Sequence, residues 1–322
     1  MFLMTKPELS IVMSVYNGAT RLRETIDSIL GQTFRQYEFI IINDGSTDES
    51  LDILSEYAAN DPRIRVLSQE NVGLAASLNR GIREAKGRLI ARQDAGDTSH
   101  PTRLETQLKY LASNPHLKIV GTQFNYVVNG SIVDTIRFPC SSNDIRNTML
   151  NSCCIMHGTA IFEKAAFFDI GGYREEFRCG QDYELWIRFT AKYNAENLLK
   201  VLYDYHIETN STTFSRLPDQ VYFTHLARWT HYYYLLGQER IDLEMRNVRY
   251  KILGGYLYWL NVVMGYDNRV TMTLLEKAIS YTDGPAHFLC KVLLALGYWK
   301  AVYHLCRWHV RQKRYAIQQI EN

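Results

Sequence analysis

The sequence lacks several features that would assign it to a specialised class of proteins. Its six cysteines include no Cys-x-x-Cys pair, so the usual spacing of zinc ligands is missing, and a chain of 322 residues does not need disulfides to fold. The formal net charge is only +2, and no basic run is interleaved with aromatic residues. We therefore expect reduced thiols and no nucleic-acid partner.

Long apolar runs are also missing. The two most apolar stretches, residues 252–264 and 288–299, are shorter than the roughly 20 residues that a membrane-spanning helix needs. The N-terminal residues do not have the layout of a signal peptide. From these absences we expect a cytoplasmic protein, with peripheral binding at the inner face of the membrane as the alternative.

The first part of the chain alternates between strand-like and helix-like segments. Short apolar, β-branched runs predict strands, and apolar residues three or four positions apart predict the helices between them. The predicted strands are 9–15, 39–42, 63–67 and 88–92, and the predicted helices are 19–31, 47–60 and 72–85. This alternation predicts an α/β fold with a mostly parallel central sheet covered on both faces.

Beyond the fourth predicted strand the pattern changes. Pro101 predicts the start of a helix, because proline is favourable in a first turn, and Asn129-Gly130 predicts a tight hairpin. The later predicted elements are helices at 101–111 and 182–193 and strands at 117–128, 131–138, 155–162 and 198–206. After these only helical patterns remain, so we divide the chain into an α/β domain, residues 1–215, and a mainly helical C-terminal extension, residues 216–322.

Polar residues directly follow two of the predicted strands. Asp44 and Gly45 follow the second predicted strand, and Asp94 and Asp97 follow the fourth. In open α/β sheets, ligands bind just beyond the carboxyl ends of the strands. Asp44 is therefore placed to accept a hydrogen bond from a ligand, and Asp94 with Asp97 offers oxygen ligands for Mg²⁺ or Mn²⁺. The plainer interpretation of both segments is a solvated turn.

Several segments, in their order and spacing, resemble the family 2 glycosyltransferases, which are inverting enzymes with a GT-A fold that use nucleotide-sugar donors. The segments are Leu9–Gly18, Tyr37–Asp48, Asn71–Gly81, Ile90–Asp97, His157–Thr159, Gly171–Tyr173 and Gly180–Trp186. The resemblance covers about residues 8–215. It implies that residues 1–215 form a Rossmann-like GT-A catalytic domain.

The resemblance implies a binding site for the donor nucleotide at the carboxyl edge of the sheet. Tyr16 is expected to pack on the base, and Asp44 is expected to accept a hydrogen bond from its ring. The alternative for Tyr16 is a core aromatic, and the alternative for Arg92 is that it only pairs with Asp94. The expected donor-binding residues are Tyr16, Asn17, Asp44, Asn79, Arg80, Arg92 and Asp94.

Asp182 is the candidate general base for the acceptor hydroxyl, because an ionised carboxylate can take a proton. In the family this residue is the Asp of a Glu-Asp pair, whereas here the pair is Gln181-Asp182. The alternative is a helix N-cap, a position that Asp favours. By the same resemblance, His157 and Gln181 are expected on the acceptor side.

The resemblance also implies a divalent metal, Mn²⁺ or Mg²⁺, at the donor diphosphate. The family pattern is Asp-Ala-Asp-Asp, whose third position contacts the metal most directly, and here that position is Gly96. The candidate ligands that remain are Asp94, Asp97 and His206. Binding of the diphosphate without a metal is the alternative.

The C-terminal extension carries an apolar helical face from Leu289 to Tyr303, next to clustered lysines and arginines. This pattern is typical of a basic amphipathic helix on an anionic membrane surface. The alternative is a helix docked on the catalytic domain, followed by a solvated basic tail.

The function implied by the resemblance is the inverting transfer of one sugar from a nucleotide-diphosphate donor, and the expected donor is a UDP-sugar. The acceptor would be a hydroxyl of a glycan or a lipid-linked glycan, in cell-surface polysaccharide biosynthesis. One rival is a nucleotidyltransferase, although residues 16–21 are a poor version of the Gly-rich, basic loop that it needs. Another is a non-catalytic glycan-binding or scaffold protein, which Gly96 and Gln181 favour and the retained aspartates oppose. The sequence indicates no oligomeric state.

Overall fold

A computed structural model of the chain describes residues 7–149, 152–207 and 227. Backbone contacts divide the chain into two compact units, Met1–Ser215 and Arg216–Asn322. The amphipathic helix predicted around Leu289–Tyr303, and with it the predicted membrane contact, lies outside the described residues. Within the described part, no helix is long and apolar enough to cross a membrane.

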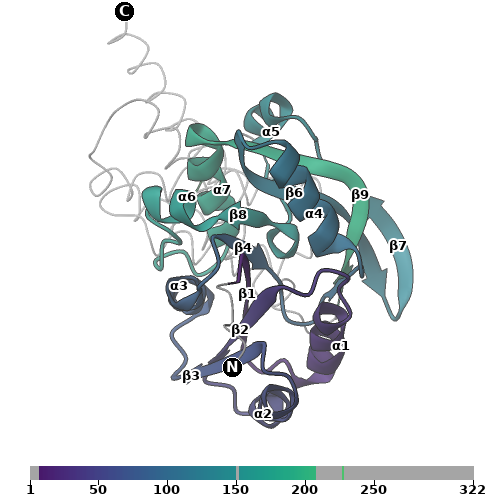
Figure 1. Ribbon diagram of the computed structural model, residues 1–322, viewed down its shortest axis with the longest axis vertical. Helices are drawn as coiled ribbons and strands as arrows, with labels where there is room; N and C mark the ends of the chain where they lie inside the picture. Colours follow the sequence, from purple (N-terminus) through teal and green to yellow (C-terminus); the bar gives the residue numbers. More distant parts are fainter. Residues whose placement is uncertain (1–6, 150–151, 208–226, 228–322) are drawn as a thin grey trace, which may run out of the picture. The chain divides into compact units, whose positions relative to one another are not determined.

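One half of the sheet is parallel and follows the predicted alternation of strands and helices (Figure 1). Its strands lie in the order β3-β2-β1-β4, and each pairs in parallel with its neighbour. The elements are β1 (Leu9–Val15), α1 (Ala19–Leu30), β2 (Tyr37–Asp44), α2 (Ser50–Asn60), β3 (Ile64–Gln69), α3 (Leu74–Glu84) and β4 (Leu89–Arg92). The α/β class is therefore confirmed.

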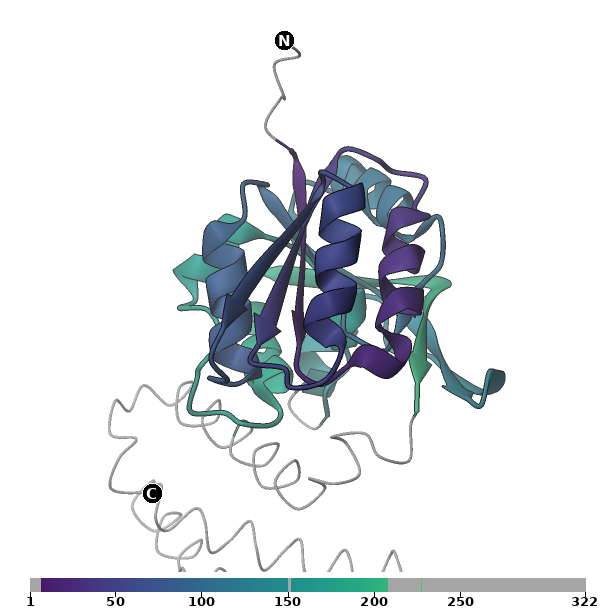
Figure 2. The ribbon, with the colours of Figure 1, turned by 90° about the horizontal axis from the view of Figure 1, so that it is seen from below.

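The central strands are apolar along their length because helices cover both faces of the sheet. All eight residues of β2 are buried, and α1 turns Leu22, Ile26 and Ile29 into the core. Helices α1 and α2 lie on one face and α3 lies on the other (Figures 1 and 2). Strands buried on both faces show continuous apolar runs rather than alternation, which is why 39–42 was recognisable.

The second half of the sheet is mixed. It continues in the order β4-β8-β6-β9-β5, with β7 paired to β6; β8 is antiparallel to both neighbours, whereas β9 is parallel to β6. Its strands are β5 (Thr98–Ser99), β6 (Leu117–Val128), β7 (Ser131–Ile136), β8 (Ile161–Glu163) and β9 (Asn194–His206). Its helices are α4 (Arg103–Ser113), α5 (Ser142–Met149), α6 (Lys164–Asp169), α7 (Gln181–Lys192) and the short 3-10 helix η1 (His157–Thr159). The predicted parallel pairing thus holds without interruption only for the first four strands.

The hairpin at Asn129-Gly130 forms as predicted. Val128 pairs directly with Ser131, and φ is +50° at Asn129 and +76° at Gly130. Two positive φ angles in a two-residue loop define the type I′ turn, whose twist matches that of the flanking strands.

The predicted strand at 155–162 is mostly wrong, because side chains take the backbone groups that a neighbouring strand would need. Arg103 donates to the carbonyl of Gly158 at 2.9 Å, and Gln107 donates to the carbonyl of Thr159 at 2.8 Å. The segment turns as η1, and only Ile161–Glu163 joins the sheet as β8.

Aromatic packing fixes α7 beside this turn. Trp186 lies edge-on to Phe162, to Phe189 and to the ring of His157, with centroid separations of 5.9–6.2 Å. All four side chains are buried. The start of α7 is therefore held next to η1, at the same edge of the sheet as the ends of β1 and β4.

Gly81 of α3 packs tightly against the sheet, and this contact generates a stability prediction. A Cβ at this position would lie 2.7 Å from Cγ1 of Val12 and 3.3 Å from Cδ1 of Ile42, both in the core. Gly81→Val should lower the free energy of unfolding by about 1–3 kcal/mol through overpacking. Arg83→Val, on the exposed face of the same helix, should change it by about 0.5 kcal/mol or less. Urea unfolding measures both; equal stabilities would mean that α3 can move away from the sheet without cost.

Candidate functional site

The carboxyl ends of β1, β2 and β4 meet at one edge of the sheet because these strands run parallel. Val15 at the end of β1 pairs with Asn43 near the end of β2. The polar segments that follow these strands are therefore neighbours in space, although they are far apart in the sequence. The candidate residues that end or follow these three strands at this edge are Tyr16, Asn17, Asp44, Asp94 and Asp97.

Asp44 holds the loop that leads into α3. Its carboxylate accepts hydrogen bonds from Gln69 Nε2 at 2.7 Å, from the backbone of Val72 at 3.0 Å and from that of Gly73 at 2.9 Å. The residue is only 2% exposed. Next to it, a Cβ at Gly45 would lie 2.6 Å from the backbone nitrogen of Asn71, so this close approach requires glycine. A contact between Asp44 and a base would use its remaining lone pairs and stays a prediction.

Tyr16 and Asn17 follow β1 with different environments. The Tyr16 side chain is 55% exposed, so the alternative of a core aromatic is wrong. Asn17 has a positive φ of +50°, and its side-chain oxygen accepts a hydrogen bond from the backbone of Thr47 at 2.8 Å. Asn17 thus ties the end of β1 to the loop after β2, and Tyr16 presents an open aromatic face beside it.

Two residues expected to bind the donor, Asn79 and Arg80, are hydrogen-bonded to other parts of the protein. The Asn79 amide is buried and bonds both backbone groups of Tyr173, at 2.9 and 3.0 Å. Asn79 therefore fastens α3 to the Gly171–Tyr173 turn, and its expected contact with ribose or phosphate stays a prediction. Arg80 is partly exposed and donates to Gln69 Oε1 at 2.7 Å and to the carbonyl of Ser68. It stays at the sheet edge, and its donor contact remains a prediction.

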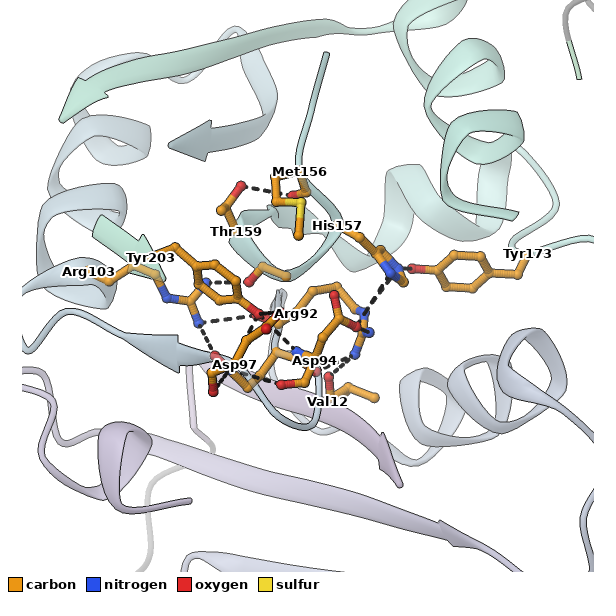
Figure 3. Close-up of polar contacts among 12 residues, drawn as sticks. Val12, Arg92, Asp94, Asp97, Arg103, Met156, His157, Thr159, Tyr173 and Tyr203 are labelled. Carbon is orange, nitrogen blue, oxygen red and sulfur yellow. Dashed lines mark hydrogen bonds and ion pairs between the residues drawn. The ribbon is translucent and has the colours of Figure 1, made fainter. Parts of the chain in front are cut away.

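Arg92 is entirely buried at the centre of the site (Figure 3). Its guanidinium donates to the carbonyls of Val12 and Gln93, to Asp94 Oδ1 at 2.5 Å and to His157 Nε2 at 3.2 Å. These donors are used by protein groups in the structure, and the expected contact of Arg92 with a donor phosphate stays a prediction. The alternative, in which Arg92 is the partner of the Asp94 carboxylate, is what the structure shows.

His157 lies between Arg92 and Tyr173. Its Nε2 is 2.7 Å from the Tyr173 hydroxyl, and its Nδ1 is 3.5 Å from Asp94 Oδ1. Burial, and then the charge of Arg92, lower the pKa of His157. Because arginine can only donate, Nε2 must accept, so the proton of the neutral ring belongs on Nδ1, toward Asp94.

Asp97 and Tyr203 form a second buried pair. The Tyr203 hydroxyl donates to Asp97 Oδ2 at 3.0 Å and accepts from the backbone of Asp94 at 3.3 Å, while Asp97 Oδ1 accepts from the backbone of His206. Burial and the neighbouring Asp94 raise the pKa of Asp97 well above its usual range. A Cβ at Gly158 would lie 2.0 Å from this hydroxyl, so the Tyr203 position requires glycine in the His157–Thr159 turn.

Arg103 is a site residue that the sequence did not identify. It is fully buried below the acidic loop and donates to the carbonyls of Gly158 and Arg92 at 2.9 and 3.1 Å. Burial lowers its pKa to about 10, which leaves it charged at neutral pH. One signal was available: a cation in the first turn of a predicted helix opposes the helix dipole and needs another reason to be there.

The expected metal ligands do not form a metal-binding group. Both oxygens of Asp97 are hydrogen-bonded, Asp94 Oδ1 is paired with Arg92, and the His206 ring lies 3.1 Å from the Thr98 hydroxyl. Within the ranges that the structure describes, no cluster of three or more His, Cys, Asp or Glu side chains could hold a metal ion. The residues present therefore do not fit a resident metal, and we derive no reaction step through one.

Asp182 lies in the first turn of α7. The N-cap of α7 is Gly180, in a left-handed conformation with φ +63° and without a side-chain cap, so the N-cap alternative for Asp182 is wrong. Asp182 is partly exposed, and its carboxylate makes no hydrogen bond or ion pair to a described residue. Its charge opposes the lowering of the His157 pKa, which places the two side chains within Coulombic reach.

The other polar residues of this helix turn are more buried than Asp182. Gln181 is buried, with 8% exposure. Glu184, the next acidic side chain, is 2% exposed and paired with Arg188 at 2.5 Å and Arg174 at 3.3 Å. A carboxylate paired in this way is held by its partners, so Asp182 is the carboxylate of this helix turn that remains available.

Comparison with known proteins identifies the family of this chain. The family described as glycosyl transferase family 2 matches residues 10–171. The O-antigen biosynthesis glycosyltransferase WbnJ of Escherichia coli is 33% identical over 214 residues, which are 65% of this chain and 83% of WbnJ.

Solved structures show the fold at low sequence identity. TarS 1–349 of S. aureus, in complex with UDP-GlcNAc, has a TM-score of 0.63 and 16% identity, covering 95% of this chain and 92% of that one. The mannosyltransferase PcManGT of Pyrobaculum calidifontis, in complex with GDP-Man and Mn²⁺, has a TM-score of 0.54 and 17% identity, covering 97% and 86%. The chain therefore has the GT-A fold and belongs to glycosyl transferase family 2 as a glycosyltransferase.

Proposed function

We propose that this glycosyltransferase moves one sugar from a nucleotide-diphosphate donor to a hydroxyl of a glycan or lipid-linked glycan, with inversion at the anomeric carbon. The observation that carries the proposal is the Asp182 carboxylate, which is partly exposed, unpaired within the described part of the chain and fixed in the first turn of α7. A group with these properties can take a proton without breaking an existing ion pair.

In the proposed reaction, Asp182 removes the proton of the acceptor hydroxyl as the oxygen attacks the anomeric carbon. The bond between that carbon and the diphosphate oxygen breaks on the opposite side, so the configuration inverts and the nucleoside diphosphate leaves. The Asp182 carboxylate can serve as the general base because it has an oxygen free of described partners to take the proton. Holding both substrates in line at this edge of the sheet further lowers the activation barrier of the transfer.

The donor base is proposed to stack on Tyr16, whose ring is exposed at the end of β1. The loop that Asp44 holds through the amides of Val72 and Gly73 borders the same edge. A UDP-sugar is the preferred donor in this proposal, supported by TarS, which was solved with UDP-GlcNAc. PcManGT was solved with GDP-Man, so a guanosine donor is the direct competitor.

The acceptor is proposed to be a growing cell-surface polysaccharide, because WbnJ is named for O-antigen biosynthesis. We further propose that the reaction takes place in the cytoplasm, where a lipid-linked acceptor would be met at the inner face of the membrane. A nucleotidyltransferase is disfavoured because family membership makes this chain a glycosyltransferase.

A panel of nucleotide sugars tests the donor assignment. UDP-sugars should raise the melting temperature more than GDP-sugars do, because only a ligand that prefers the folded state stabilises it. Differential scanning fluorimetry at equal ligand concentrations provides the comparison. A larger shift with GDP-mannose would transfer the assignment to guanosine donors.

Asp182→Asn should lower turnover by about 10²–10⁴-fold, because asparagine cannot accept the proton. Donor affinity and melting temperature should stay close to wild type, since the carboxylate makes no structural bond to a described residue. Release of the nucleoside diphosphate with an active acceptor measures turnover, and calorimetry measures donor affinity. Asp52→Asn, in the first turn of α2, is a matched control with expected wild-type turnover. Turnover within a few-fold of wild type for Asp182→Asn would place the base elsewhere.

Tyr16→Ala should weaken nucleotide binding by about 5- to 150-fold, the range expected for one base stacked on an aromatic ring at ~1–3 kcal/mol. Tyr16→Phe keeps the ring and should bind nearly as well as wild type. Because the side chain is 55% exposed, neither change should alter the melting temperature appreciably. UDP titration by calorimetry would exclude the stacking role if the alanine variant bound with unchanged affinity.

A further inference from the structure

The acidic loop between β4 and β5 has an empty position where the family pattern places a carboxylate. Gly96 has φ +97°, and a Cβ built there would meet no atom within 4 Å. This glycine is therefore not required by packing. Compared with the family pattern, the glycine removes one carboxylate from a side of the loop where no protein atom lies within 4 Å of that Cβ position.

The carboxylates that remain in this loop are already bonded to other groups of the protein. Asp94 is paired with Arg92, and Arg103 lies directly below through its bonds to the carbonyls of Arg92 and Gly158. One oxygen of Asp94 is used by Arg92, and both oxygens of Asp97 are used by Tyr203 and by the backbone of His206. A divalent cation entering this loop would have to compete with these hydrogen bonds for its oxygen ligands.

Arg21 approaches the same loop from the first turn of α1. Its Nε donates to the carbonyl of Gly96 at 3.0 Å, and Thr25 on the next turn accepts from the Gly96 amide at 3.0 Å. The Arg21 side chain is 20% exposed, unlike Arg92 and Arg103, which are fully buried. It is thus a cation that is anchored at position 96 and still reaches solvent.

Only a weak partner competes for the Arg21 guanidinium. Nη2 is paired with Glu24, one turn along the helix, whose side chain is 57% exposed. Exposed ion pairs of this kind contribute little to stability. Nη1 makes no hydrogen bond to any described residue, so it remains available to an incoming anion.

We propose that the donor diphosphate binds without a resident divalent metal, and that Arg21 supplies the positive charge next to position 96. A guanidinium suits this task because its planar donors match two phosphate oxygens at once. The inference rests on the proposed function, since it presupposes a nucleotide-diphosphate donor. It assigns a role to a residue that the sequence motifs did not single out.

The first test is UDP affinity by calorimetry in 1 mM EDTA and in 1 mM Mn²⁺, about the concentration range at which weak sites fill. Wild type should bind with dissociation constants that agree within about threefold. Arg21→Gln should weaken binding by roughly 10- to 100-fold in both buffers, the loss expected for one charge-assisted hydrogen bond. Arg23→Gln is the matched control, because Arg23 lies on the same helix but pairs with Glu56 in solvent; it should bind as wild type does.

A second pair of variants tests the empty position directly. Gly96→Asp restores the carboxylate, and Gly96→Ala introduces the same backbone strain at φ +97° without a charge. The aspartate variant should lose UDP affinity in EDTA and regain at least tenfold in Mn²⁺, because the new carboxylate neutralises Arg21 and gives the metal a ligand. The alanine variant should show no such dependence on Mn²⁺.

Three results would overturn the inference. These are wild-type affinity that falls tenfold or more in EDTA, Arg21→Gln binding as tightly as wild type, and equal Mn²⁺ responses of Gly96→Asp and Gly96→Ala. If neither UDP nor GDP bound wild type in either buffer, the proposed function itself would fail instead. A melting curve for each variant establishes that it is folded, and the comparison of wild type in two buffers needs no variant.

Discussion

The buried charge of Arg92 is the constraint on which this site depends. A guanidinium without solvent must have its donors satisfied, and breaking such a pair by removing one partner costs about 3–5 kcal/mol. Its partners come from β1, from the loop after β4 and from η1, so the bonds join the parallel half of the sheet to the mixed half. Arg92 also orients Asp94, and burial together with the charge of Arg92 lowers the pKa of His157. This edge of the sheet is therefore built around a fully buried cation.

The sequence predicted the parallel half well because its signals are local. Strands buried on both faces are apolar runs, and the helices between them carry regularly spaced apolar residues, so β1 to β4 appear at nearly the predicted positions. The hairpin at Asn129-Gly130 was also predictable, because a type I′ turn needs two residues that tolerate positive φ. What failed was the segment 155–162, whose backbone partners are the side chains of Arg103 and Gln107 from a distant helix. No local pattern encodes such a contact.

The site shows the same division between local and distant information. Motifs at strand ends located Tyr16, Asp44 and Asp94 at one edge, because parallel topology determines where such ends meet. They did not distinguish residues that face solvent from residues that serve as supports. Asn79 and Arg92 proved to be supports, since their polar groups are used by Tyr173 and Asp94. Arg103 and Tyr203 were missed because their importance depends on tertiary contacts that span large sequence separations.

The glycine at position 158 has a consequence for how the acidic loop can be exchanged between scaffolds. The Tyr203 hydroxyl fills the space that a side chain at 158 would need, and the same hydroxyl bonds both the backbone of Asp94 and the carboxylate of Asp97. If residues 94–97 alone were transferred to another protein, the loop would lack the Tyr203 hydroxyl that bonds it. A side chain at the position equivalent to 158 in that protein would also leave no room for the tyrosine ring. The transferable module is therefore a discontinuous one, in which the loop, its glycine and its tyrosine come from three separate stretches of the chain and have to be moved as a set.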